Sequence, residues 1–166
     1  MAKSERVKQC LAIAKQSVHR WVPNGKRPIL GFNPEPGNPY IVLRDVTYTN
    51  PLVTVPIKQG TTLDLASIPR FLWAIPGLSP TDANKRAALL HDVLYAEQKV
   101  DRVIADALFV SVLKADGVNF FVRWGMYMAV RIFGERAWAE NARRNERRER
   151  ALAAAKELEA AKRLNP

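Results

Sequence analysis

Apolar residues recur at steps of three and four positions in two parts of the chain, near the N-terminus and after residue 79. In the second part this spacing predicts three helices, over about residues 80–98, 101–117 and 119–138. These helices begin at residue types that favour helix starts, namely Ser79, Asp101 and Asn119. In the first part the spacing predicts an amphipathic helix over residues 4–22, whose apolar stripe consists of Val7, Leu11, Ala14, Val18 and Trp21.

The stretch between these helical patterns favours strands. Residues 40–58 contain two runs of β-branched and aromatic side chains, separated by a turn at Asn50-Pro51. Pro56 has no N–H to donate to a ladder, so its strand is expected at the edge of a sheet. Two or three short antiparallel strands are therefore predicted. The following segment, 61–78, is apolar but interrupted by prolines, so we expect it to wrap over the core without forming a long helix.

From Glu140 onward the chain consists mainly of alanine, glutamate, arginine and lysine. Glutamate precedes arginine by four positions at Glu140/Arg144, Glu146/Arg150 and Glu159/Arg163. In this order such pairs stabilise a helix by about 0.2–0.5 kcal/mol each. We therefore expect a protruding charged helix that continues the third helix before it.

These patterns predict an α+β fold, in which a small antiparallel β-sheet or hairpin packs on a helical bundle. The N-terminal amphipathic helix and the long protruding C-terminal helix are added to this core. The corresponding organisation is a basic helical region over 1–27, a core over 28–138 with strands within 40–58 and helices within 80–138, and a charged helical tail over 139–166.

Composition adds a strong basic bias to this picture. The 166 residues carry a formal net charge of +10, and most of the excess lies at the two ends. Basic ends are typical of contact with nucleic acid, an anionic membrane or an acidic protein surface, and they also keep a protein soluble. The single cysteine, Cys10, excludes an internal disulfide framework and zinc sites built from several thiolates. No apolar stretch is long enough to span a bilayer and no signal peptide is evident, so we expect synthesis in the cytoplasm.

The candidate chemistry lies in two separate segments. His91 shares a predicted helical face with Ala87 and Leu94, so it is expected to point inward. An acid–base or divalent metal site would use His91 with carboxylates, and the residues for it are the catalytic candidates Asp64, His91, Asp92 and Asp106, with Asp64, His91 and Asp92 as metal ligands. The only other histidine, His19, is expected in the distant N-terminal helix, and no organic cofactor is predicted.

The structural alternative is a buried polar latch. In this interpretation polar side chains pair with one another and fix the proline-bounded segment to the helices, since a buried polar group that loses its partner costs about 1–3 kcal/mol. The residues of this latch are Asp64, Arg70, His91 and Tyr95. The sequence leaves both interpretations open.

Four short stretches of the sequence give the chain a resemblance to a known family. They are Asp64-Leu65-Ala66-Ser67-Ile68-Pro69-Arg70, His91-Asp92-Val93-Leu94-Tyr95, Ala105-Asp106 and Phe133-Gly134-Glu135-Arg136-Ala137-Trp138. Over about residues 40–138 the chain resembles an uncharacterised domain family of tailed phages and prophages with T-D-x-A-S-x-P-R and H-D-x-L-Y motifs. Leu63 departs from the threonine that is usual in this family, which removes a hydroxyl from the candidate site.

The resemblance implies a phage or prophage origin and no particular chemistry. The expected function is a virion structural protein, a small adaptor of the tail or of the head–tail neck. Its partners would be other virion proteins and copies of itself, with contact to DNA through the basic termini and without a membrane span. The protein would then be located in the virion. The alternative is a phage hydrolase, acting on the cell wall or a phosphoester through an Asp/His site during entry or lysis.

Overall fold

The computed structural model describes residues 5, 8, 9, 12, 19–22, 30–33, 40–63 and 84–164. In these parts of the chain six short strands lie between residues 20 and 63 and three long helices follow, which confirms the predicted α+β class. The strands are β1 (Arg20–Val22), β2 (Leu30–Phe32), β3 (Tyr40–Val42), β4 (Val46–Thr49), β5 (Thr54–Ile57) and β6 (Thr62–Leu63). The helices are α2 (Lys85–Glu97), α3 (Arg102–Ala115) and α4 (Phe120–Leu164).

The strands form two antiparallel three-stranded sheets, in the orders β1-β4-β5 and β2-β3-β6. Strand β4 lies in the centre of the first sheet and alternates between buried and half-buried residues, with Val46 and Tyr48 in the core. Pro56 lies in β5 at the edge of this sheet, opposite Thr47, as predicted. The turn at Asn50 is also confirmed, because its side-chain oxygen accepts hydrogen bonds from the two backbone N–H groups of Leu52 and Val53.

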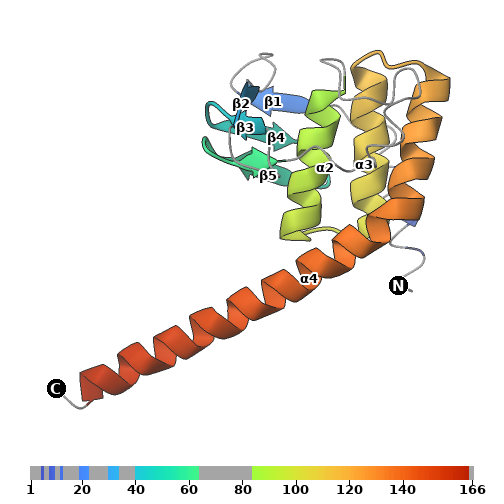
Figure 1. The fold of residues 1–166 in the computed structure, drawn as a ribbon. Helices are drawn as coiled ribbons and strands as arrows, with labels where there is room; N and C mark the ends of the chain where they lie inside the picture. The colour runs from blue at the N-terminus through green and yellow to red at the C-terminus, as the bar shows by residue number, and fades with distance from the viewer. Residues whose placement is uncertain are drawn as a thin grey trace.

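Helices α2, α3 and the first part of α4 lie side by side next to the sheets (Figure 1). Helix α2 ends at Gln98, which adopts a left-handed conformation with φ 51° and returns its N–H to the carbonyl of Leu94. Gly117, with φ 79°, allows the chain to turn after α3. The side chain of Asn119 caps α4 by accepting a hydrogen bond from the N–H of Val122. These helix ends agree with the sequence prediction.

The 45 residues of α4 form one helix that first packs against α3 and α2 and then leaves the body of the molecule (Figure 1). Its core residues are Met126, Ala129 and Val130. Further along, the side-chain amide of Asn145 donates to the carbonyl of Ala96, and all residues from 146 to 163 are exposed. The predicted continuous, protruding helix is therefore confirmed. We call its residues 146–164 the arm.

Several details differ from the sequence prediction. Glu5, Lys8, Gln9 and Ala12 are helical, but the N-terminal helix does not extend over residues 4–22, because residues 20–22 form β1. Trp21 is buried as expected, yet it packs edge-on against Tyr48 of the neighbouring strand, at 5.0 Å between ring centroids. The step of three residues from Val18 to Trp21 fits a helical pattern. Trp21 and Val22 also pack well on a sheet, however, and pairing with β4 makes this segment a strand.

The strand run predicted over residues 41–48 is divided between the two sheets, because the chain leaves β3 at Leu43 and enters β4 at Val46. The start predicted for the helix at Ser79 and the wrapping predicted for 61–78 lie largely outside the described residues, which stop at Leu63 and resume at Asn84. In the part of the chain that the structure describes, no helix has an apolar stretch that could cross a membrane.

Candidate functional site

A buried carboxylate joins the three helices. Asp106 on α3 is fully buried, and its Oδ1 accepts a hydrogen bond from His91 Nε2 at 2.9 Å and from the Tyr95 hydroxyl at 2.7 Å, both from α2. Its Oδ2 accepts a hydrogen bond from the Arg131 guanidinium of α4 at 2.7 Å. We call these four residues the Asp106 cluster. His91 and Tyr95 both reach one oxygen because residues four apart lie on the same face of a helix.

The charges in the Asp106 cluster follow from this geometry. Burial raises the pKa of Asp106, but the hydrogen bonds from His91, Tyr95 and Arg131 outweigh burial and hold it below its usual value. Burial lowers the pKa of His91, and the nearby carboxylate opposes that effect only in part. Near neutral pH the cluster therefore contains an ionised Asp106, a cationic Arg131 and a neutral His91 that donates through Nε2.

Arg102, one turn before Asp106 on α3, connects the Asp106 cluster to the backbone of α4. Its Nε lies 3.3 Å from the Tyr95 hydroxyl and 3.8 Å from Asp106 Oδ2. The other end of its guanidinium donates to the carbonyl oxygens of Val130 and Arg131. A side chain that bonds carbonyls inside a helix is a recognised cause of bending, and α4 changes direction as it leaves the body (Figure 1).

The next turn of α4 closes over Tyr95. The ring of Trp138 packs edge-on against the ring of Tyr95, at 5.0 Å between centroids. A Cβ added to Gly134 would lie only 2.6 Å from the Tyr95 hydroxyl oxygen, so only glycine fits at that position without displacing the ring. The side-chain amide of Gln98 also donates to the Trp138 carbonyl. The aromatic and glycine residues near the bend are thus spatially joined to the Asp106 cluster.

The structure brings together three of the residues that the sequence singled out, His91, Tyr95 and Asp106. Asp92 follows His91 by one position, about 100° further round the helix, and is only half-buried. Asp64 and Arg70 lie outside the described residues, so the parts of the catalytic, metal and latch predictions that depend on them stay predictions.

The sequence analysis placed Asp106 among the catalytic candidates and did not connect it with the latch. It missed Arg102 and Arg131 altogether. The sequence does contain one indication that Asp106 is buried and paired, because it shares its helical face with Phe109 and Leu113. An acid among core residues needs a buried partner. The partners themselves come from two other helices, which spacing along one helix does not reveal.

What the Asp106 cluster can do chemically is limited by its burial. His91 and Asp106 are almost completely inaccessible to solvent, and both oxygens of Asp106 already accept hydrogen bonds. Among the described residues no three His, Cys, Asp or Glu side chains are grouped as metal ligands. The Asp106 cluster is a buried network of hydrogen bonds and one ion pair, which stabilises the packing of α2, α3 and α4.

His19 also differs from its predicted place in a distant helix. It precedes β1, and its ring nitrogens pair with the Tyr48 hydroxyl at 2.6 Å and with Ser111 Oγ of α3 at 2.8 Å. Burial and the nearby positive charge of Arg86 lower its pKa. Both histidines therefore link elements to α3: His19 joins the first sheet to it and His91 joins α2 to it.

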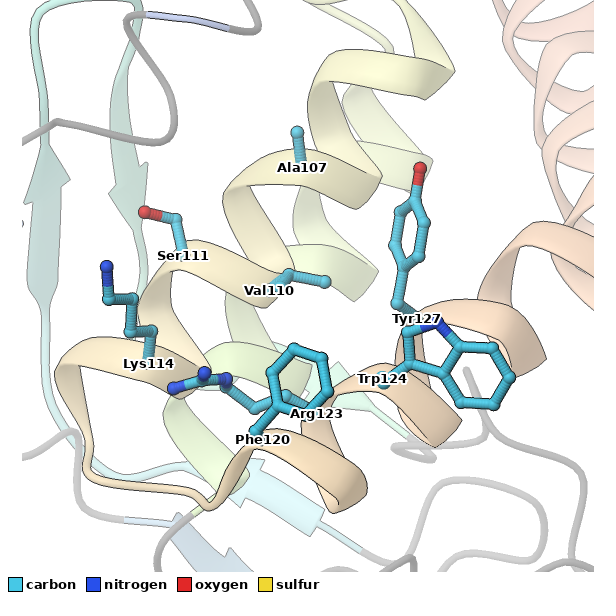
Figure 2. Close-up of a pocket in the computed structure, with 8 residues that line it drawn as sticks. All are labelled: Ala107, Val110, Ser111, Lys114, Phe120, Arg123, Trp124 and Tyr127. Carbon is cyan, nitrogen blue, oxygen red and sulfur yellow. The ribbon is translucent and has the colours of Figure 1, made fainter.

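A cavity of about 410 Å³ lies between α3 and the start of α4. Figure 2 shows Val110 of α3 and Phe120 of α4 facing it from opposite sides, with Lys114 and the Arg123 guanidinium at one end and Trp124 toward the other. The cavity thus combines apolar and aromatic walls with two cations. Its complete lining consists of Ala107, Val110, Ser111, Lys114, Phe120, Arg123, Trp124 and Tyr127, none of which belongs to the Asp106 cluster.

Comparison with known proteins gives a family but no function. No curated protein and no solved structure matches the chain. The model of one protein family, described as protein of unknown function DUF1353, matches residues 40–130, a segment that includes His91, Tyr95 and Asp106. Because this segment is more than half of the chain, the protein belongs to the DUF1353 family.

Proposed function

We propose that the chain is a structural protein of a tailed bacteriophage particle, a small adaptor of the tail or of the head–tail neck that binds neighbouring subunits through its core and its basic ends. The phage setting depends on the sequence resemblance carried by the Asp64–Arg70 and His91–Tyr95 segments. The structural role depends on the shape of the molecule, in which a compact body carries a long projecting helix (Figure 1).

The observation that carries the proposal is the arm. Its 19 residues extend about 28 Å at 1.5 Å per residue, and the side chains of 146–163 are exposed. A helix of this length is marginal when isolated in water, but here it continues a helix that is already anchored in the core. The arm buries nothing against its own domain, so it contributes little to the stability of that domain. A rigid, solvent-exposed rod of this kind is suited to contact with another subunit.

The chemistry of the arm and of the turns before it indicates the kind of surface it contacts. Residues 143–150 contain five arginines and two glutamates. Arg150 reaches Glu146 at 3.9 Å, and the exposed pair Arg136–Glu140 lies at 2.9 Å, so part of the charge is paired along the helix. The remaining cations would favour an acidic protein surface or the phosphates of packaged DNA.

The alternative hydrolase finds less support in the geometry. A hydrolytic His–carboxylate pair needs access to substrate and water, and His91 and Asp106 are both buried. The cavity beside α3 is lined by other residues. The Asp106 cluster therefore favours a structural role for these two side chains.

Mass spectrometry of purified particles of the encoding phage tests the proposal. We expect the protein at a fixed copy number relative to the major capsid protein. Replacing Arg147, Arg148 and Arg150 with glutamine should leave the thermal unfolding temperature unchanged, since these side chains are exposed, and should reduce incorporation into particles. The same three residues changed to lysine keep the charge and serve as the matched control. Absence of the wild-type protein from particles would contradict the proposal.

A further inference from the structure

The cavity between α3 and α4 is formed by one face of each helix. On both helices its lining residues follow one another at positions i, i+3, i+4 and i+7, which places each set on a single helical face. They are Ala107, Val110, Ser111 and Lys114 on α3 and Phe120, Arg123, Trp124 and Tyr127 on α4. Between them the two faces leave about 410 Å³, a volume within the range of small-ligand sites.

The walls of the cavity are mainly aromatic and aliphatic. Figure 2 shows Val110 and the ring of Phe120 on opposite sides, with the rings of Trp124 and Tyr127 further along α4. Phe120 is 62% exposed and Trp124 is 59% exposed, so a ligand from solvent can reach both rings. Aromatic rings pack favourably against other rings, in stacked or edge-on geometry. The walls therefore favour a ligand with an aromatic body.

Two cations lie at the end of the cavity that is nearest the turn between the helices. Lys114 belongs to the last turn of α3 and Arg123 follows the start of α4 by three positions. Figure 2 shows both side chains at this end, with Ser111 on the same side. Among the described residues, neither cation has an ion pair or a side-chain hydrogen bond. This end of the cavity therefore carries positive charge that the described part of the chain does not neutralise.

The acids of α3 and of the first turns of α4 are already paired. Between residues 102 and 134 the acids are only Asp106 and Asp116. Asp106 is engaged in the Asp106 cluster, and Asp116 accepts a hydrogen bond from Arg86 of α2. An anion from outside would supply the missing charge at Lys114 and Arg123. Hydrogen bonds from such cations to a carboxylate or phosphate are stronger than those between neutral groups.

Ser111 adds a hydroxyl at the same end. Its Oγ lies 2.8 Å from Nε2 of His19, whose Nδ1 lies 2.6 Å from the Tyr48 hydroxyl oxygen. In the tautomer in which Tyr48 donates to Nδ1 and Nε2 donates to Ser111, the hydroxyl hydrogen of Ser111 is left to donate to an acceptor in the cavity. An anion at this end would then meet an ammonium, a guanidinium and a hydroxyl.

We propose that this cavity binds a small aromatic anion, a molecule of one or two rings that carries a carboxylate, sulfonate or phosphate group. Its rings lie between Val110 and the aromatic side chains of α4, and its anionic group meets Lys114 and Arg123. The lining extends over seven positions of each helix, about 10 Å, which suits such a molecule and is short for an extended long acyl chain. A nucleoside monophosphate and a simple aryl acid share this chemistry. The binding site lies apart from the arm, so this proposal goes beyond the assembly role.

The first experiment titrates the full chain with two fluorescent probes. Anilinonaphthalene sulfonate is an aromatic anion, and phenylnaphthylamine has the same rings without the sulfonate. Changing Lys114 and Arg123 together to glutamine should raise the dissociation constant of the sulfonate by roughly tenfold or more and that of the amine by less than about twofold. The matched control changes Arg147 and Arg148 to glutamine, which removes two charges from the arm and should leave both constants unchanged. Thermal unfolding of each variant verifies that it is folded.

A second pair of variants tests the walls. Phe120 and Phe121 are both exposed, and their rings pack edge-on at 5.7 Å between centroids, so a change at either position loses the same contact. Of the two, Phe120 alone lines the cavity. Phe120→Ser should therefore raise the dissociation constants of both probes by roughly fivefold or more, while Phe121→Ser should leave them within about twofold.

Competition against the bound sulfonate distinguishes the two sources of the ligand. Displacement by adenosine monophosphate supports a nucleotide site, and displacement by indole acetate supports a site for an aryl acid. The proposal is overturned by the absence of saturable sulfonate binding, by displacement with neither competitor, or by binding that the Lys114 and Arg123 changes leave unaltered. Equal effects of Phe120→Ser and Phe121→Ser would also overturn it. These titrations do not depend on whether the chain is found in phage particles, so the two proposals succeed or fail separately.

Discussion

At the scale of single residues, the fold depends on one buried carboxylate with donors from two other helices. Replacing Asp106 with asparagine keeps the shape but removes the charge that Arg131 faces and turns an acceptor into a donor. Loss of one member of a buried ion pair costs about 3 kcal/mol or more. We expect the free energy of unfolding, measured in urea, to fall by about 3 kcal/mol.

The exposed carboxylate of Asp45 provides the control for this change. It pairs with Lys58 at 2.7 Å on the surface, where both side chains are hydrated. Asp45→Asn should therefore destabilise far less than Asp106→Asn. Equal losses for the two variants would show that the Asp106 cluster does not stabilise the fold.

Single buried residues also determine how the free energy of unfolding depends on pH. Burial lowers the pKa of both His91 and His19 below the ordinary 6.5. As the pH falls through 6.5 the unfolded chain binds protons that the folded chain does not, so the free energy of unfolding decreases. Asp106, whose pKa is also lowered, adds a second loss below pH 3.8.

Urea unfolding at pH 7.5, 6.5 and 5.5 measures the first of these losses. The double variant His91→Gln, His19→Gln should be less stable than the wild type at pH 7.5 but should lose less stability on acidification. A slope in the double variant as steep as in the wild type would show that other groups cause the dependence.

At the scale of elements, α4 approaches α2 so closely at Gly134 that a glycine-to-alanine change there should destabilise the protein, although such a change usually stabilises a helix. Alanine is a better helix former than glycine by about 0.5–1 kcal/mol, so a glycine-to-alanine change inside an open helix stabilises it. At Gly134 the new Cβ would meet the Tyr95 hydroxyl, and we expect a net loss of about 1–3 kcal/mol. Tyr95→Phe removes that oxygen, so the double variant Gly134→Ala, Tyr95→Phe should be more stable than the sum of the two single losses predicts. The free energies of unfolding of the wild type, the two single variants and the double variant measure this difference. Additive losses would contradict the contact.

The helices and strands also show how much of the fold could be predicted from the sequence. The ends of α2 and α3 and the start of α4 followed from local features, such as the Asn119 side chain that caps α4. Strands β1, β2 and β6 were missed because two or three residues are too few to show an alternating pattern, and pairing with neighbours determines them. At the site, an inward-facing His91 was predictable from its helical position. Its pairing with Asp106, and the pairing of Asp106 with Arg131, were not, because these residues come from different helices.

At the scale of the whole molecule, the chain combines a body of dense packing with an arm that has none. Local opening is least costly where few contacts hold the backbone, so trypsin should cut the arm at Arg147, Arg148 or Arg150 well before it cuts the body. Timed digestion followed by mass spectrometry should show loss of the C-terminal residues and a persistent fragment ending near residue 147. Simultaneous cleavage within α2 or α3 would contradict this division.

The bend of α4 beside Arg102 has a mechanical consequence. Because the arm continues a helix held by the Asp106 cluster, it acts as a lever whose pivot lies inside the body. The tip of the helix lies 33 residues beyond Arg131, or about 50 Å, so a rotation of about 10° at the pivot would move it by roughly 9 Å. A substitution deep in the core can therefore misdirect a contact made far outside it, even when the body keeps its fold.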